Sequence, residues 1–158
     1  MNQALVHYHF GSIDNLRRDS VMAGLMPAIQ GLIDELLDDR PLPESIHRVM
    51  RLIDDFDVET EVGVLMAEAL LQATRDPSMT EAMAGIMGSW GETLGPRLMV
   101  AQERGVVRGD IPPERLTPVI ASFIDGFLIQ RMADPGLDAA AAADTLITLL
   151  SPPVEDTP

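Results

Sequence analysis

Residues 12–37 read SIDNLRRDSVMAGLMPAIQGLIDELL, and this stretch decides the fold class. Its apolar residues recur every three or four positions from Leu16 to Leu37, which is the spacing of an amphipathic helix. Ser12 is a good N-cap, and Asp14 places a negative charge in the first turn. Pro27 lies inside the pattern and predicts a kink, because proline lacks the amide donor and clashes with the preceding turn.

Helical spacing continues along the whole chain, and no stretch shows the alternation of a strand. Ser78 is expected to be the N-cap of a helix that Gly95-Pro96 bends or breaks. The segment 59–75 is apolar nearly all round, so that helix should be central. Further helices are expected at about 46–56, 59–75, 79–94, 96–104, 113–133 and 138–150. The sequence therefore predicts an all-α fold with one helical domain over residues 12–150 and a disordered tail over 151–158.

The composition limits the classes of function. The net charge is −14, so a polyanion such as DNA is repelled by the average field, and any DNA-binding surface must be local or outside this chain. Cysteine is absent, which excludes disulfides, thiolate metal sites and cysteine nucleophiles. The longest apolar runs are broken by Asp, Glu or Gln, so we expect no membrane span, and no signal peptide is apparent. These features favour a cytoplasmic protein.

Two stretches carry a family resemblance. The first is NQALVHYHFGS over residues 2–12. The second runs from Gly105 to Asp138, where Gly-x-x-Arg-x-Asp-Ile is followed by Asp125-Gly126-Phe127 within a predicted helix. Together with the number of helices, they resemble the TetR-type (tetracycline-repressor-like) transcriptional regulators. The resemblance implies that residues 1–11 are the remnant of a helix-turn-helix DNA-binding domain, and that residues 12–150 bind an effector and dimerise.

The first stretch resembles the end of a recognition helix, which presents short polar side chains to base edges in the major groove. Asn2 and Gln3 are of the type that pairs with adenine, while His7 and Tyr8 suit phosphate oxygens. The alternative is that the apolar residues of this stretch are ordinary core and its polar residues are solvated. The candidate DNA-contacting remnant is Asn2, Gln3, Ala4, His7, Tyr8 and His9.

Two departures from the family pattern affect DNA binding. Ile13 stands where the family has a lysine that contacts phosphate, and the first two helices of the DNA-binding domain are missing. A misassigned start and a truncation both remain open. We expect this chain to be N-terminally truncated and deficient in DNA binding, with operator DNA a partner only of a full-length form.

A small hydrophobic effector is the second expected partner. Ligand-binding sites are usually concave and apolar, with a few polar groups. The many methionines would suit such a site, although methionine more often simply fills the core. A polar stripe of Glu61, Glu68, Gln72 and Arg75 is interpreted as solvent edge rather than cavity lining. The candidate effector-binding residues are Phe56, Met66, Leu70, Met83, Met87, Trp90 and Phe123.

A homodimer held by the last two helices is the third expectation. The helix over 113–133 is apolar over a face wider than one core contact requires, and a soluble monomer rarely leaves a large apolar patch open. The alternative is that both helices only complete the core of one chain. The candidate interface residues are Val119, Ile120, Ile124, Gly126, Phe127, Ala139, Ala143, Leu146, Ile147 and Leu150.

Metal, cofactor and catalytic sites receive little support from the sequence. His7 and His9 point to opposite sides of a helix, and Glu44-x-x-His47 lacks the second copy that a di-iron site requires, so no metal or cofactor is expected. No catalytic motif is present, so no enzymatic activity is expected. The row Gly85, Gly88, Gly91 and Gly95 is compatible with close helix approach or with a pocket wall. The sequence therefore predicts a TetR-like transcriptional regulator that acts as a repressor. The alternative is a helical small-molecule-binding or scaffold protein with no DNA role.

Overall fold

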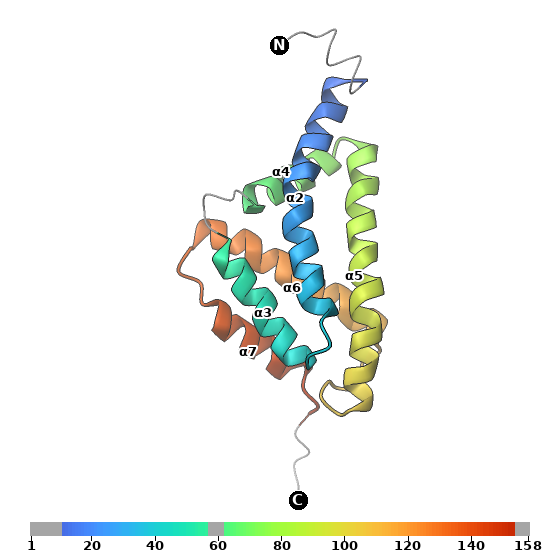
Figure 1. Ribbon diagram of the computed structural model, residues 1–158, viewed down its shortest axis with the longest axis vertical. Helices are drawn as coiled ribbons and strands as arrows, with labels where there is room; N and C mark the ends of the chain where they lie inside the picture. Colours follow the sequence, from blue (N-terminus) through green and yellow to red (C-terminus); the bar gives the residue numbers. More distant parts are fainter. Residues whose placement is uncertain (1–10, 57–61, 154–158) are drawn as a thin grey trace, which may run out of the picture.

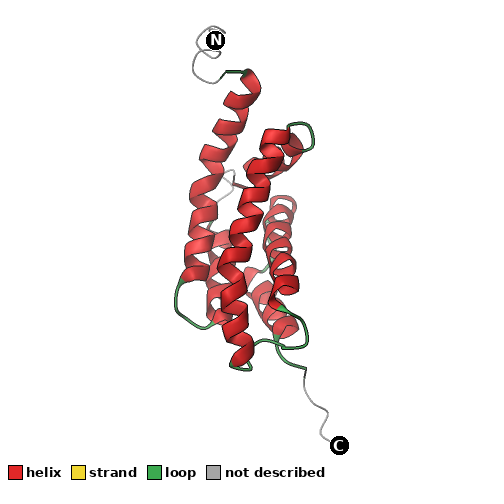
Figure 2. Cartoon of the chain, turned by 90° about the vertical axis from the view of Figure 1, so that its right-hand side faces the viewer, coloured by secondary structure: helices red, strands yellow, loops and turns green. Residues whose placement is uncertain are grey.

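The computed structural model describes residues 11–56 and 62–153 of the chain. These residues are helices joined by short loops, with no strand among them (Figure 2). The all-α prediction is confirmed. The helices are α2 (Ile13–Leu37), α3 (Leu42–Asp55), α4 (Val62–Ala73), α5 (Pro77–Glu103), α6 (Pro113–Ala133) and α7 (Ala139–Leu150). Of the tail predicted to be disordered, residues 154–158 lie outside the described residues.

The two longest helices, α2 and α5, run side by side along the long axis (Figure 1). α6 crosses the bundle and packs mainly on α5, whereas α7 lies along α3. α3 and α7 are also joined by polar contacts, because His47 Nε2 lies 3.2 Å from a carboxylate oxygen of Asp144. On α6, Arg131 bonds to Asp54 at the end of α3. The last two helices therefore close the core of the single chain.

α2 begins as the sequence predicts. The Ser12 hydroxyl oxygen accepts a hydrogen bond from the Asn15 amide at 3.0 Å, and the helix continues through Pro27 to Leu37. By length and composition alone, α2 is long and apolar enough to cross a membrane, which by itself is weak evidence for a membrane span. The core helix of a soluble protein passes the same test, and α2 packs on α3, α4 and α5. Its buried residues are Val21, Leu25, Ile29, Leu32, Ile33 and Leu36.

The prediction for α5 was wrong in two places: the residue that caps its N-terminus and the break expected at Gly95-Pro96. Its N-cap is Asp76, whose carboxylate accepts from the Ser78 amide at 2.9 Å, and Pro77 occupies the first turn. Proline fits there because that amide has no partner within the helix. α5 also runs unbroken past Gly95-Pro96 to Glu103. Pro96 removes one hydrogen bond, but Leu94 and Leu98 on either side are fully buried, and their packing holds the helix together.

α4 is less central than its composition predicts. One face, including Met66 and Ala69, is buried between α2, α5 and α6, but Val64 and Leu71 are about half exposed. Glycine allows this close packing. A Cβ added to Gly63 would lie 2.6 Å from Cγ of Met132 on α6. An all-apolar helix was expected to be surrounded, and in this chain it is covered on one side only.

A partly buried arginine fixes the turn between α2 and α3. Arg97 on α5 donates to the backbone carbonyls of Leu36 and Arg40 and, at 3.1 Å, to the hydroxyl of Ser45. Burial lowers the pKa of Arg97. The last carbonyls of a helix have no partner within it, and a cation there also complements the helix dipole. Arg97 therefore ends α2 with a side chain that comes from a distant helix.

Candidate functional site: a groove between α5 and α6

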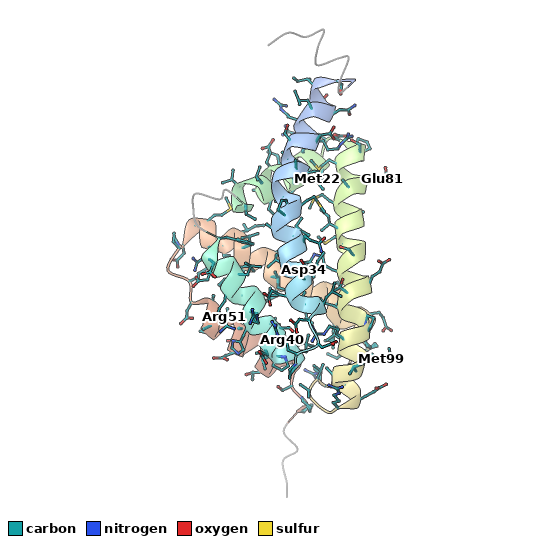
Figure 3. The ribbon with its side chains drawn as sticks, viewed as in Figure 1. Met22, Asp34, Arg40, Arg51, Glu81 and Met99 are labelled. Atoms are coloured by element: carbon teal, nitrogen blue, oxygen red, sulfur yellow. The ribbon has the colours of Figure 1, made fainter. Side chains whose placement is uncertain are left out.

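A groove of about 640 Å³ lies between α5 and α6. It lies beside the later half of α5, between the positions of Glu81 near the start of that helix and Met99 near its end (Figure 3). Most of its lining is apolar. The lining residues are Met87, Trp90, Gly91, Gly95 and Met99 from α5, and Pro113, Glu114, Thr117, Pro118, Ala121 and Ser122 from α6.

The α5 wall combines large and very small residues. Trp90 is only 2% exposed and forms part of the base, whereas Met87 and Met99 are 40% and 52% exposed. A Cβ added to Gly91 or Gly95 would meet no atom of the described residues within 4 Å. These glycines therefore do not serve close helix packing within the chain. They widen the groove, because a larger side chain at either position would occupy it.

The α6 wall supplies the polar groups. The Thr117 hydroxyl donates its proton to the carbonyl of Pro113 at 2.9 Å, so toward a ligand it offers only lone pairs. The Glu114 carboxylate is an acceptor when ionised, and Ser122 carries an exposed hydroxyl. No basic residue lines the groove. The arrangement suits an apolar molecule that carries a hydrogen-bond donor.

One carboxyl on α6 has an unusual environment. Asp125 lies one turn beyond Ala121 and Ser122, and burial raises its pKa from the ordinary 3.8 to about 6. Within residues 11–56 and 62–153 it forms no hydrogen bond or ion pair that would offset this burial. Desolvation without a partner disfavours the charged form of a carboxyl. No local pattern of residues signals this burial, because the burial of a residue on an amphipathic helix depends on the segments packed against it.

The part of the chain that holds the groove matches a known family. Residues 44–151 match the family model described as BetI-type transcriptional repressor, C-terminal. The chain belongs to the TetR-type regulators. The matched range contains every residue of the groove and extends to the end of α7. No match was found among the curated proteins or among the solved structures that were compared.

In this TetR-type regulator, the predicted effector-binding residues separate into three groups. Met87 and Trp90 line the groove. Leu70 is 43% exposed on α4 and lines no part of it. The remaining candidates are packed in or against the core and do not surround a common cavity with the first two: Phe56, Met66, Met83 and Phe123.

The other groove residues were not among those predicted to bind an effector; they include Gly91, Met99 and the whole α6 wall. One signal was available. The row of glycines in α5 was interpreted as either a contact or a pocket wall, and Gly91 and Gly95 do lie in the wall. Glu114, Thr117 and Ser122 gave no signal, because polar residues on a helix surface are ordinary.

The predicted dimer residues of the regulator lie mostly inside the single chain. Val119 is 59% exposed, and Gly126 and Ile147 are partly buried. The others are buried in the core of this chain, and the dimer interface stays a prediction. The buried candidates are Ile120, Ile124, Phe127, Ala139, Ala143, Leu146 and Leu150.

The remaining candidates are surface features or cannot be placed. The DNA-contacting candidates at residues 2–9 lie outside the described residues, as does Glu61. Glu68 and Arg75 are exposed, and together with the partly buried Gln72 they line a smaller polar hollow of about 320 Å³. The Gln72 Oε1 atom is buried and has no hydrogen-bond partner among the described residues, so this stripe lies at the solvent edge and lines a cavity as well. Among the residues that the structure describes, no group of three potential ligands could hold a metal ion.

Proposed function

We propose that this chain provides the effector-binding and dimerisation part of a TetR-type transcriptional repressor, and that a small, mostly apolar molecule binds in the α5–α6 groove. The observation that carries the proposal is the groove itself. It has a volume of about 640 Å³ and lies entirely within the range that matches the repressor family. Ligand sites are typically concave, apolar and equipped with a few polar groups that fix orientation.

The polar groups of the groove narrow the class of effector. Glu114 and Thr117 present acceptors, and the chain carries a net charge of −14. An anionic ligand would be repelled by this field and would find no basic partner in the lining. We infer an apolar, non-anionic effector that can donate a hydrogen bond to Glu114 or Thr117, while the Ser122 hydroxyl can either donate or accept. No enzymatic role is proposed.

A route from the groove to the start of α2 supports a regulatory role. α5 runs without a break from the groove residue Met87 back to Ser78 near its first turn. The Ser78 hydroxyl accepts a hydrogen bond at 2.8 Å from Arg18, which lies in the second turn of α2. A ligand that binds one arrangement of α5 more tightly shifts the population of that arrangement. Through Arg18, the shift reaches the helix that follows the DNA-binding remnant.

A ligand screen with matched glycine variants tests the proposal. Gly91 and Gly88 lie one turn apart on α5, and both have open space around a built Cβ, but only Gly91 lines the groove. Apolar compounds with a hydrogen-bond donor are screened by thermal stability and by the fluorescence of Trp90, the single tryptophan. We expect hits on the natural chain and on Gly88→Leu, and their loss on Gly91→Leu. Hits that survive Gly91→Leu unchanged would place the ligand elsewhere.

Hydrogen exchange tests the regulatory route. A compound that binds the groove is expected to change amide exchange in the first three turns of α2, and Ser78→Ala should weaken this change while binding persists. A ligand that leaves exchange in α2 unaltered would favour a helical binding protein without a regulatory role.

A further inference from the structure

A polar hollow of about 320 Å³ lies near the start of α5, away from the α5–α6 groove. The first turns of α2, the last turn of α4 and the start of α5 come together there, at the upper end of the molecule in Figure 1. The hollow and the groove share no lining residue. The lining residues are Asp14, Asn15 and Arg17 from α2, Glu68, Leu71 and Gln72 from α4, and Arg75, Asp76 and Pro77 from the turn after α4 and the start of α5.

Gln72 brings to this hollow an acceptor that the surrounding protein leaves unpaired. Its Oε1 atom is buried and accepts no hydrogen bond from the residues that the structure describes. The backbone of Gln72 is held in place, because its carbonyl accepts from the amides of Arg75 and Asp76, both at 2.9 Å. Buried amide oxygens nearly always have a partner, since leaving one unpaired costs free energy. A ligand in the hollow that donates to Oε1 would remove this cost.

Charged side chains of both signs line the hollow around this acceptor. Glu68 lies one helical turn before Gln72, and Arg75 follows it by three residues. Asp14 and Arg17 are also three residues apart, in the first turns of α2. All four charged side chains are exposed, and none forms an ion pair or a hydrogen bond within residues 11–56 and 62–153. Two cations and two anions therefore line one space without neutralising each other.

The fifth charge of the lining is already engaged. The Asp76 carboxylate accepts from the hydroxyl and the amide of Ser78 at 2.8 Å and 2.9 Å, and these hydrogen bonds, with the nearby charge of Arg18, lower its pKa. The two remaining carboxylates and the net charge of −14 would repel an anion, whereas the two guanidinium groups would repel a simple cation. A ligand that carries both charges finds a partner for each.

We propose that this hollow is a second ligand site, and that it binds a small zwitterion of the amino-acid type. The ammonium group donates to Gln72 Oε1 and is attracted by Asp14 and Glu68, whereas Arg17 and Arg75 hold the carboxylate. Guanidinium groups suit carboxylates because they can donate two parallel hydrogen bonds to them. A volume of about 320 Å³ is at the lower end of the range of small-molecule sites, as a ligand of this size requires. The inference does not depend on the proposed function.

Titration calorimetry with the standard L-amino acids, each tested singly, measures the binding. We expect at least one of them to bind the natural chain with a Kd below about 1 mM. If none binds, the hollow holds water only and the proposal is wrong.

Analogues of the best binder test the two ends of the ligand separately. Its decarboxylated amine keeps the ammonium but lacks the group that Arg17 and Arg75 would hold. Its N-trimethyl derivative keeps both charges but has no N–H to donate to Gln72. Both should bind at least about tenfold more weakly than the amino acid. An amine that binds as tightly as the amino acid would exclude a zwitterion site.

A matched pair of glutamine variants locates the binding. Gln72→Met keeps the approximate shape of the side chain and removes the acceptor, and Gln130→Met is the control at an exposed position of α6. We expect Gln72→Met to weaken amino-acid binding at least about tenfold, whereas Gln130→Met should bind normally. The urea midpoint of the ligand-free Gln72→Met chain should not fall, because the change removes an unpaired buried oxygen. Unchanged binding by Gln72→Met would contradict the assignment.

A matched pair of arginine variants tests the charge at exposed positions, where folding does not depend on the side chain. Arg75→Gln removes a cation from the hollow, and Arg51→Gln removes one from α3, away from the hollow (Figure 3). We expect Arg75→Gln to bind the amino acid at least about tenfold more weakly and to bind its decarboxylated amine no more weakly than the natural chain does. Arg51→Gln should bind both as the natural chain does. An Arg75→Gln chain that still prefers the amino acid to the amine would refute the role of Arg75.

Gly91→Leu separates this site from the groove. The leucine occupies the α5–α6 groove, so amino-acid binding should be unchanged, while the apolar hits of the ligand screen are lost. Gln72→Met should have the opposite effect on the two kinds of ligand. Amino-acid binding that is lost on Gly91→Leu and unaffected by Gln72→Met would place the amino acid in the groove and overturn the proposal of a second site.

Discussion

Replacing Asp125 with asparagine should stabilise the chain, and the gain should depend on pH. The carboxyl of Asp125 lies partly buried on α6, and burial raises its pKa from 3.8 to about 6. The folded chain therefore binds this proton more tightly than the unfolded chain does. The stabilisation that protonated Asp125 provides is complete below about pH 4 and is lost as the pH rises through about 6. Asparagine keeps the shape of the side chain and cannot ionise.

The magnitude follows from the two pKa values. A difference of about two pH units between them corresponds to roughly 3 kcal/mol of unfolding free energy when the group is fully ionised. Partial exposure to solvent reduces this electrostatic cost, so we expect Asp125→Asn to be more stable than the natural chain by about 1–2 kcal/mol at pH 8. About half of the difference should develop between pH 5 and pH 7, and the rest below that range.

Urea unfolding followed by far-ultraviolet circular dichroism measures this difference at a series of pH values. The protein concentration must be held constant, because dimerisation would shift the apparent stability. Glu92→Gln removes one negative charge from the exposed surface of α5 and controls for the change in net charge. An Asp125→Asn chain that is less stable than the natural one at pH 8, or whose advantage is the same at pH 5 and pH 8, would refute the reasoning.

Three further predictions concern stability and use the same unfolding assay. Arg97→Met should cost about 2–3 kcal/mol, because the backbone carbonyls of Leu36 and Arg40 lose their partly buried donor; an unchanged midpoint would show that water replaces the guanidinium. Gly63→Leu should cost about 1–3 kcal/mol by forcing α4 away from Met132, whereas Gly88→Leu, with open space around it, should not destabilise. Asp76→Ala should cost about 1 kcal/mol through loss of the α5 N-cap, and no loss would indicate that another group caps the helix.

Local sequence determined the helices of this chain. Ser12 caps α2 as expected, and α6 and α7 begin and end close to the predicted positions. Such features are readable because capping and amphipathic spacing depend on residues three or four positions apart. Two short motifs and the helix number were also sufficient to suggest the family that the match over 44–151 shows. The start of α5 was wrong by two residues because Asp76 and Ser78 are equally acceptable caps.

Tertiary structure alone decided which apolar surfaces face inward. Val64 and Ile120 both lie on apolar helices, yet one is 54% exposed and the other is fully buried. Periodicity cannot separate them, because it describes one helix and not the helix that packs against it. For the same reason, the sequence could not show that Met66 and Ile124, which were predicted for binding and dimerisation, are buried within the single chain.

The groove arises from the way in which α5 and α6 meet. Gly91 and Gly95 of α5 line the groove together with Pro118 and Ala121 of α6 because the two helices pack against each other at these residues. The sequence supplied small residues at those positions, and the packing of the surrounding core determined that the space they leave remains open. Likewise, the raised pKa of Asp125 is a property of its surroundings. Burial is set by contacts between segments distant in the chain, and no local pattern of residues encodes it.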